Sequence, residues 1–251
     1  MPKLSTTFYE EPLILPGSEG EQLEARWCFN TYELHAVMLL LPGQGSNPVD
    51  LDGRVTCALT GPSIGDVPPD LNKHLAHRLA EKGIATLRYT KRSLADRDLA
   101  QNLVKDAQIA LKHMKGKFPY LQTGILGFSE GALLAMAVAS EDRVDALFLI
   151  APPTRRLSEV FRFQYLDWSH SLFSEKLDTD RDGFVTAQEL NLFSQKQLPL
   201  TGKPWDEVLD NSKEKFSIAD EILPIYQGLH ENILLAMQNP PFLNWFSPPH
   251  I

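Results

Sequence analysis

Alternation between apolar runs and amphipathic helical patterns constrains the fold of this chain more than any other feature of its sequence. The runs that predict buried strands are residues 35–41, 84–89, 124–128 and 144–150. Continuous apolar runs of this length are typical of strands that are buried on both faces of a sheet. The helical patterns between them are residues 71–79, 99–116 and 131–139. This alternation predicts an α/β fold, with a mostly parallel sheet and helices on both faces.

The residues before and after this alternation show other sequence patterns. Residues 8–29 predict two short edge strands, separated by the turn residues Pro16-Gly17-Ser18. After residue 153 we find helical periodicity but no further buried-strand run. We therefore expect a core at residues 1–153 and a helical cap at residues 154–251.

The segment Gly127-Phe128-Ser129-Glu130-Gly131 has the pattern G-x-S-x-G and lies between a predicted strand and a predicted helix. In that context the pattern forms a nucleophile elbow, a sharp turn that exposes the serine oxygen above the carboxyl edge of the sheet. The glycines are needed because flanking side chains would clash in such a turn. The backbone N–H of Glu130, at the start of the helix, is the expected first donor of an oxyanion hole.

A second oxyanion donor should come from the loop after the first parallel strand. Leu41-Pro42-Gly43-Gln44-Gly45 is found there, and its glycines allow the backbone to turn N–H groups towards a developing negative charge. We take the N–H of Gln44 as the candidate. The alternative is a plain turn made by glycine and proline.

Several ordered motifs resemble those of one family of bacterial α/β-hydrolases, close to dienelactone hydrolases and EstD-type esterases. Residues 39–45 with 50–53 are similar to its G-S-G-P-x-D-R-D-G stretch, residues 85–92 to its R-Y-D-K-R-G, and residues 124–131 to its G-H-S-E-G elbow. The resemblance implies an α/β-hydrolase core. It also implies hydrolysis of a small carboxylic ester by a Ser/Asp/His triad, with Ser129 as nucleophile.

The resemblance extends to Arg88 and Arg92, which match positions of the family. We expect both side chains to pair with carboxylates and hold a loop rather than to act in catalysis.

After Ser129 the sequence departs from the pattern expected for an α/β-hydrolase fold. The acid and the base should follow on loops after two later strands, and we find no such strands, so we expect a core that lacks its last strands. His170 and His230 lie in helical patterns, and His250 is close to the last residue. We therefore assign neither acid nor base. A fragment of a longer enzyme and a truncated, catalytically poor chain are the leading explanations, ahead of a partner that supplies the rest.

Residues 178–189 match the calcium-loop pattern D-x-D-x-D-G-x₅-E at every specified position. Calcium prefers six to eight oxygen ligands. The ligands of an EF-hand here would be the carboxylates of Asp178, Asp180 and Asp182, the carbonyl of Phe184, Thr186 through water, and both oxygens of Glu189.

The neighbouring residues fit the same interpretation. Gly183 would allow the sharp bend, and Val185 lies where EF-hands pair through a short strand. The alternative is an acidic, solvated turn. A second loop with this pattern is absent from the sequence, so we expect a structural calcium clamp on the cap rather than cooperative sensing.

Composition and net charge limit the binding partners and the cellular compartment that we expect for this protein. The net charge of −8 disfavours nucleic acid and an anionic membrane surface. No apolar run is long enough to span a bilayer, and the first residues lack the features of a secretory signal, so we expect a cytoplasmic protein. Cys28 and Cys57 are expected to be reduced, buried thiols. The sequence identifies no protein partner.

Three functional hypotheses remain open. The first is a serine esterase with a structural calcium site, and the second is a non-catalytic calcium-binding protein on a degenerate or truncated hydrolase scaffold. A lactonase or peptidase on the same fold is the third, because pocket shape, which the sequence does not reveal, sets acyl specificity.

Overall fold

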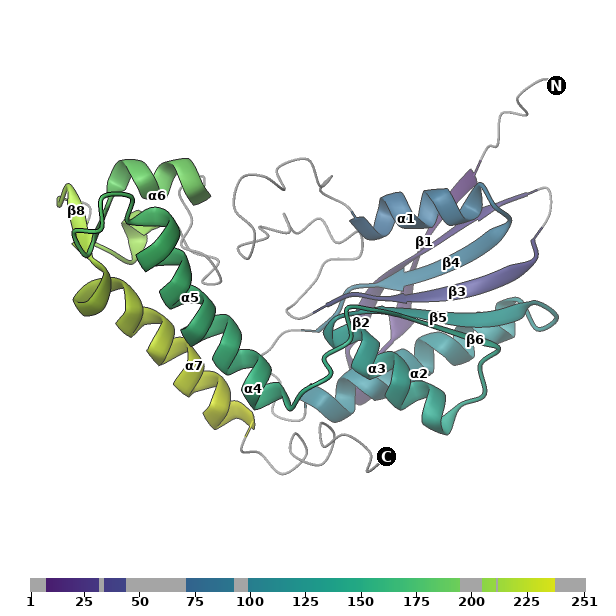
Figure 1. Cartoon of the computed structure of the whole chain (residues 1–251). Coiled ribbons are helices and arrows are strands. Elements are labelled where there is room, and N and C mark those ends of the chain that lie inside the picture. The colour runs from purple at the N-terminus through teal and green to yellow at the C-terminus, as the bar shows by residue number, and fades with distance from the viewer. Residues whose placement is uncertain are drawn as a thin grey trace, which may run out of the picture. The chain divides into compact units, whose positions relative to one another are not determined.

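The chain forms two compact units in the computed structural model (Figure 1), which describes residues 8–31, 34–43, 71–92, 99–194, 205–210 and 212–237. Among these residues the division falls between Pro153 and Thr154. The first unit contains a six-stranded sheet, and the second contains helices and a small two-stranded sheet.

The large sheet is mostly parallel. Its strands are β1 (Phe8–Pro16), β2 (Gln22–Asn30), β3 (Ala36–Leu41), β4 (Ile84–Tyr89), β5 (Gln122–Phe128) and β6 (Ala146–Ile150), in the spatial order β1-β2-β4-β3-β5-β6. Strands β4, β3, β5 and β6 pair in parallel, as the apolar runs predict. The prediction of two edge strands is wrong for β2, because β2 also pairs antiparallel with β4.

Helices cover both faces of this sheet. They are α1 (Leu71–Ala80), α2 (Leu99–Lys117) and α3 (Glu130–Glu141). Helix α1 lies on one face, while α2 and α3 lie on the other (Figure 1). The buried side chains of α2 include Leu103, Ala107, Leu111 and Met114, whose spacing is that of one helical face. The predicted layers are therefore confirmed.

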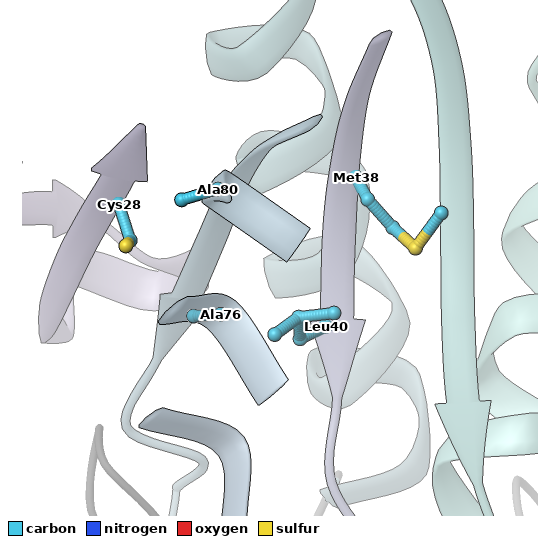
Figure 2. Packing of buried hydrophobic residues seen from close by; sticks show 5 residues of the cluster. All are labelled: Cys28, Met38, Leu40, Ala76 and Ala80. Atoms are coloured by element: carbon cyan, nitrogen blue, oxygen red, sulfur yellow. The ribbon is translucent and has the colours of Figure 1, made fainter. Parts of the chain in front are cut away.

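The core beneath α1 is built from small residues on the helix and larger ones on the sheet. Figure 2 shows Ala76 and Ala80 of α1 beside Cys28 of β2, with Met38 and Leu40 of β3 completing the cluster. The two alanines let the helix approach the strands closely. Cys28 is a free, fully buried thiol, as expected, whereas Cys57 lies outside the described residues.

The second unit consists mainly of helices. Helix α4 (Leu157–Arg162) and helix α5 (Trp168–Ser171) are continued by π-helical turns at Phe163–Asp167 and Leu172–Leu177. After an acidic loop come strand β7 (Phe184–Thr186) and helix α6 (Ala187–Ser194). The remaining elements are a 3₁₀ turn at Trp205–Glu207, strand β8 (Lys215–Ser217), a π-helical turn at Ile218–Ile222 and helix α7 (Leu223–Met237). No helix in the described part of the chain is both long enough and apolar enough to cross a bilayer.

The small sheet of this unit corrects the expectation of helices alone. Strands β7 and β8 pair antiparallel, with Val185 opposite Phe216. The calcium-loop pattern predicts a short strand at Val185, but three residues in β8 are too few to produce a periodicity in the sequence. Both side chains are fully buried, and the rings of Phe216 and Trp205 pack with their centroids 5.6 Å apart.

Candidate functional site

Ser129 occupies the turn between a strand and a helix that the sequence predicts. Strand β5 ends at Phe128, and α3 begins at Glu130. Ser129 has φ 54° and ψ −117°, a backbone conformation that few residues other than glycine adopt and that is concentrated at functional sites. Its N–H donates to the carbonyl of Ile150, 2.9 Å away, which ties the turn to β6.

The glycines on either side of Ser129 allow three segments to meet. A Cβ atom on Gly127 would lie 2.2 Å from the carbonyl oxygen of Gly131. A Cβ atom on Gly131 would lie 2.2 Å from the carbonyl oxygen of Leu41. Real side chains do not approach backbone atoms so closely. Only glycine at both positions lets the ends of β3 and β5 pack against the start of α3.

Backbone N–H groups are available near the serine. Glu130 is the first residue of α3, and the N–H groups in the first turn of a helix have no acceptor within that helix. A Cβ atom on Gly43 would lie 3.5 Å from Cβ of Ser129, so Gly43, just after β3, also lies beside Ser129. Gln44, the second predicted donor, is outside the described residues.

In the described part of the first unit, the hydroxyl of Ser129 has no structural role. It does not cap α3, and among the described residues of the first unit it makes no hydrogen bond to a histidine or a carboxylate. His77 instead bonds to Glu10 at 2.8 Å, and the ring of His113 packs 5.9 Å from that of Trp27. The first unit therefore presents Ser129 beside the start of α3, and its described residues place no base at the hydroxyl.

Two of the histidines after Ser129 lie in helices, as the sequence predicts. His170 is exposed on α5, and His230 is on α7 of the second unit. His250 lies outside the described residues.

The two arginines of the R-Y-T-K-R segment pair with carboxylates, as expected. The guanidinium of Arg88 donates to Glu10 at 2.7 Å. Arg92 donates to both carboxylate oxygens of Asp106, at 2.7 and 2.9 Å, and to the backbone and hydroxyl oxygens of Ser18. The contacts of Arg92 fasten the segment after β4 to α2 and to the turn between β1 and β2, whereas that of Arg88 joins β4 to β1.

Lys91, between these arginines, is the residue at the site that the sequence did not single out. Its side chain is 2% exposed, and its ammonium donates to the carbonyl of Gly43 and to the carboxylate of Glu130. In the sequence, Lys91 could have been recognised as a candidate site residue because it comes just after a buried strand, at the carboxyl edge of the sheet.

The acidic loop of the second unit has its carboxylates gathered together. One oxygen from each of Asp178, Asp180 and Asp182 lies within 4.8 Å of the others. Gly183 has φ 83°, with open space where a side chain would be, and this confirms the predicted bend. Glu189 closes the loop, because its carboxylate accepts from the hydroxyl of Thr179 at 2.8 Å.

Hydrogen bonds keep two of these carboxylates in their ionised form. The pKa of Asp182 is lowered, first by the hydrogen bond from the Lys215 ammonium at 3.0 Å and then by the N–H of Phe184. Burial raises the pKa of Glu189, but hydrogen bonds from Thr186 and Thr179 outweigh it, so that the net shift is downward. A cluster of carboxylate oxygens without nitrogen or sulfur ligands suits a hard cation such as Ca²⁺.

A second group of possible metal ligands belongs to the core. Atoms of Glu10, Cys28 and His77 lie within 4.8 Å of one another. The carboxylate of Glu10 already pairs with His77 and with the cationic Arg88. Burial, followed by the charge of Glu10, raises the pKa of the Cys28 thiol to about 12, whereas a thiol binds metal as the thiolate. These residues form a hydrogen-bonded network that suits packing better than a cation.

Comparison with known proteins relates part of the chain to an esterase. Esterase EstD of Thermotoga maritima is 32% identical over 126 residues, which are 48% of this chain and 28% of that protein. The chain thus matches less than a third of the length of this curated relative. No protein-family model matches the chain.

Solved structures show a weaker likeness. The dienelactone hydrolase of Anabaena variabilis is 17% identical, with a TM-score of 0.44 over 61% of this chain and 67% of that chain. An esterase of Pyrococcus furiosus is 16% identical, with a TM-score of 0.46 over 64% and 62%. The mostly parallel sheet, the strand–serine–helix turn and the sequence match to EstD together give the first unit an α/β-hydrolase fold with esterase-like relatives.

Proposed function

We propose that the first unit is the nucleophile-bearing part of a serine hydrolase that cleaves small carboxylic esters. The observation that carries this proposal is the strained backbone of Ser129, with φ 54° between β5 and α3. Such strain persists only where the surrounding structure enforces it, and here two glycines and a hydrogen bond to β6 do so. The sequence match to EstD, which is named an esterase, supports esters as the substrate class.

The reaction follows from the position of the serine. Its oxygen attacks the ester carbonyl carbon, while its proton passes to a base and negative charge develops on the carbonyl oxygen. The N–H groups of Glu130 and Gln44 are the proposed donors to that oxygen. The alcohol then leaves with a proton, and a water molecule hydrolyses the acyl-enzyme.

We propose that the triad's acid and base lie outside the described residues of the first unit. The exposure of apolar side chains on β6 supports this proposal. Leu147, Phe148 and Ile150 of that strand are 39%, 48% and 45% exposed, although strands of parallel sheets are normally buried on both faces. Further elements packed against β6 would cover these side chains, and loops after such strands are where the acid and base of this fold are carried.

A fluorophosphonate probe tests the nucleophile directly, because it labels only activated serines. The wild-type protein should be labelled at Ser129, and Ser129→Ala should lose the labelling altogether, together with any turnover of p-nitrophenyl acetate. Ser140→Ala is the matched control, because Ser140 is exposed near the end of α3 and bonds only to its own helix. Labelling that persists in Ser129→Ala would refute the proposal.

The second candidate function is a non-catalytic calcium-binding protein on the same scaffold. It is favoured by the lack of a hydrogen bond between the Ser129 hydroxyl and a base among the described residues of the first unit. The same probe separates the two functions. Wild-type protein that binds calcium but remains unlabelled would establish this candidate instead.

We further propose that residues 178–189 form a structural Ca²⁺ site in the second unit. The clustered carboxylates, the left-handed glycine and the closing contact of Glu189 support it. The proposed ligands are those of the EF-hand pattern, namely Asp178, Asp180, Asp182, the carbonyl of Phe184, Thr186 and Glu189. Because β7 lies within these residues and pairs with β8, a bound cation would also fix the small sheet.

Calcium should therefore stabilise the chelator-treated protein. At a concentration of 100 Kd the gain is about 2.7 kcal/mol, or about 5 to 10 °C in the melting temperature. Isothermal titration should show that Glu189→Gln weakens binding by about tenfold or more, because the carboxylate that closes the site is lost. Glu175→Gln is the control, since Glu175 bonds only to Ser171 within its own helical segment. An unchanged melting temperature and no heat of binding would contradict the site.

A further inference from the structure

Lys91 is a buried cationic residue near Ser129. It follows β4 by two residues, and its side chain is 2% exposed. A buried ammonium is costly unless it is paired and hydrogen-bonded. Here it is satisfied by the carboxylate of Glu130, which is itself 13% exposed, and by the carbonyl oxygen of Gly43.

The partners of Lys91 belong to the two backbone segments that flank Ser129. Glu130 follows the serine and opens α3. Gly43 ends the described part of the segment after β3, and a Cβ atom on it would lie 3.2 Å from Cδ1 of Phe128 and 3.5 Å from Cβ of Ser129. A single ammonium thus joins the end of β4 to both sides of the serine.

We propose that Lys91 is a positioning residue for the oxyanion hole, an inference that rests on the proposed hydrolase function. The N–H of Glu130 and that of Gln44, which follows Gly43 in the sequence, are the proposed donors. Such donors act only at about 2.7–3.1 Å from the developing oxyanion. A displacement of about 1 Å can cost about 100-fold in rate. By binding the carbonyl of Gly43 and the side chain of Glu130 at once, Lys91 fixes the spacing between the two donor segments.

The charge of Lys91 has a second effect on the same site. The carboxylate of Glu130 is one residue from the serine, and an unpaired negative charge there would oppose a negative charge on the substrate oxygen. Lys91 neutralises it. Loss of the ammonium would therefore both release the two segments and leave a repulsive charge beside the reaction centre.

The test compares Lys91→Met with the double variant Lys91→Met/Glu130→Gln. We expect the second-order rate of fluorophosphonate labelling to fall by about 10- to 100-fold in Lys91→Met. In the double variant the unpaired charge is gone, so the melting temperature should recover, while labelling should regain only the part lost to that charge and stay slower than in wild type. Labelling that recovers in step with the melting temperature would assign Lys91 a merely structural role and overturn the inference. Lys117→Met, which breaks the surface pair with Glu11, should label at the wild-type rate.

Hydrogen exchange provides a readout that does not depend on catalysis. Peptides that cover residues 39–45 and 127–134 should exchange about tenfold faster in Lys91→Met than in wild type, because both segments lose a shared anchor. Unchanged exchange would overturn the inference whatever the labelling shows. If wild-type protein is not labelled at all, the hydrolase proposal fails, and the exchange rates alone decide whether Lys91 positions the two segments.

Discussion

Replacing Gly131 by alanine is expected to destabilise the first unit more than any other single added methyl group on α3. The new Cβ atom would lie 2.2 Å from the carbonyl oxygen of Leu41 and 2.5 Å from that of Pro42. Both obstacles are backbone atoms, so no rotation of a side chain can relieve the clash. Overpacking of a core costs about 1–3 kcal/mol. Since β3 or α3 itself would have to move here, we expect a loss of about 3 kcal/mol or more.

Urea unfolding followed by circular dichroism measures this loss. Gly116→Ala is the matched control, because Gly116 lies in α2 with open space where a side chain would be. Alanine should be neutral there or stabilising by up to about 1 kcal/mol, since glycine is a poor helix former. Gly131→Ala should also abolish fluorophosphonate labelling, because the turn that holds Ser129 would open. Equal unfolding midpoints for the two variants would show that the three segments do not pack as described.

The elements around the serine are predictable from the sequence because their signals are local. Strand β4 spans Ile84–Tyr89, the same residues that the sequence predicts for it, and almost all of its side chains are buried. The turn at Ser129 is predictable because a helix that starts directly after a buried strand leaves room only for glycine on either side. The bend at Gly183 is equally local, since the calcium-loop pattern places it by spacing alone.

Features that depend on pairing between distant residues could not be predicted in this way. Strand β2 has the composition of an edge strand, yet it is interior, because β4 pairs with it from about 60 positions further along the chain, as in the pair Ala25 and Tyr89. Lys91 and Glu130 are 39 positions apart. Nothing in either local sequence indicates that they meet. The contact exists only because parallel strands bring the ends of β3, β4 and β5 to one edge of the sheet.

Asp106→Asn is expected to produce the second large loss of stability. Asp106 is fully buried on α2 and accepts four hydrogen bonds, two from Arg92 and two from the backbone N–H and hydroxyl of Ser18. Asparagine has the same shape but carries no charge, so the guanidinium of Arg92, which is 7% exposed, would lose its counter-charge. Breaking a buried ion pair on one side costs about 3–5 kcal/mol.

Two comparisons separate this effect from the general cost of a polar substitution. Glu11→Gln removes one partner of the surface pair between Glu11 and Lys117, in which Glu11 is 49% exposed, and should cost no more than about 1 kcal/mol. The double variant Asp106→Leu/Arg92→Met removes both charges and should recover much of the loss, because no unpaired cation remains buried. If Asp106→Asn unfolds at the same urea concentration as Glu11→Gln, the buried pair does not hold α2 to the segment after β4.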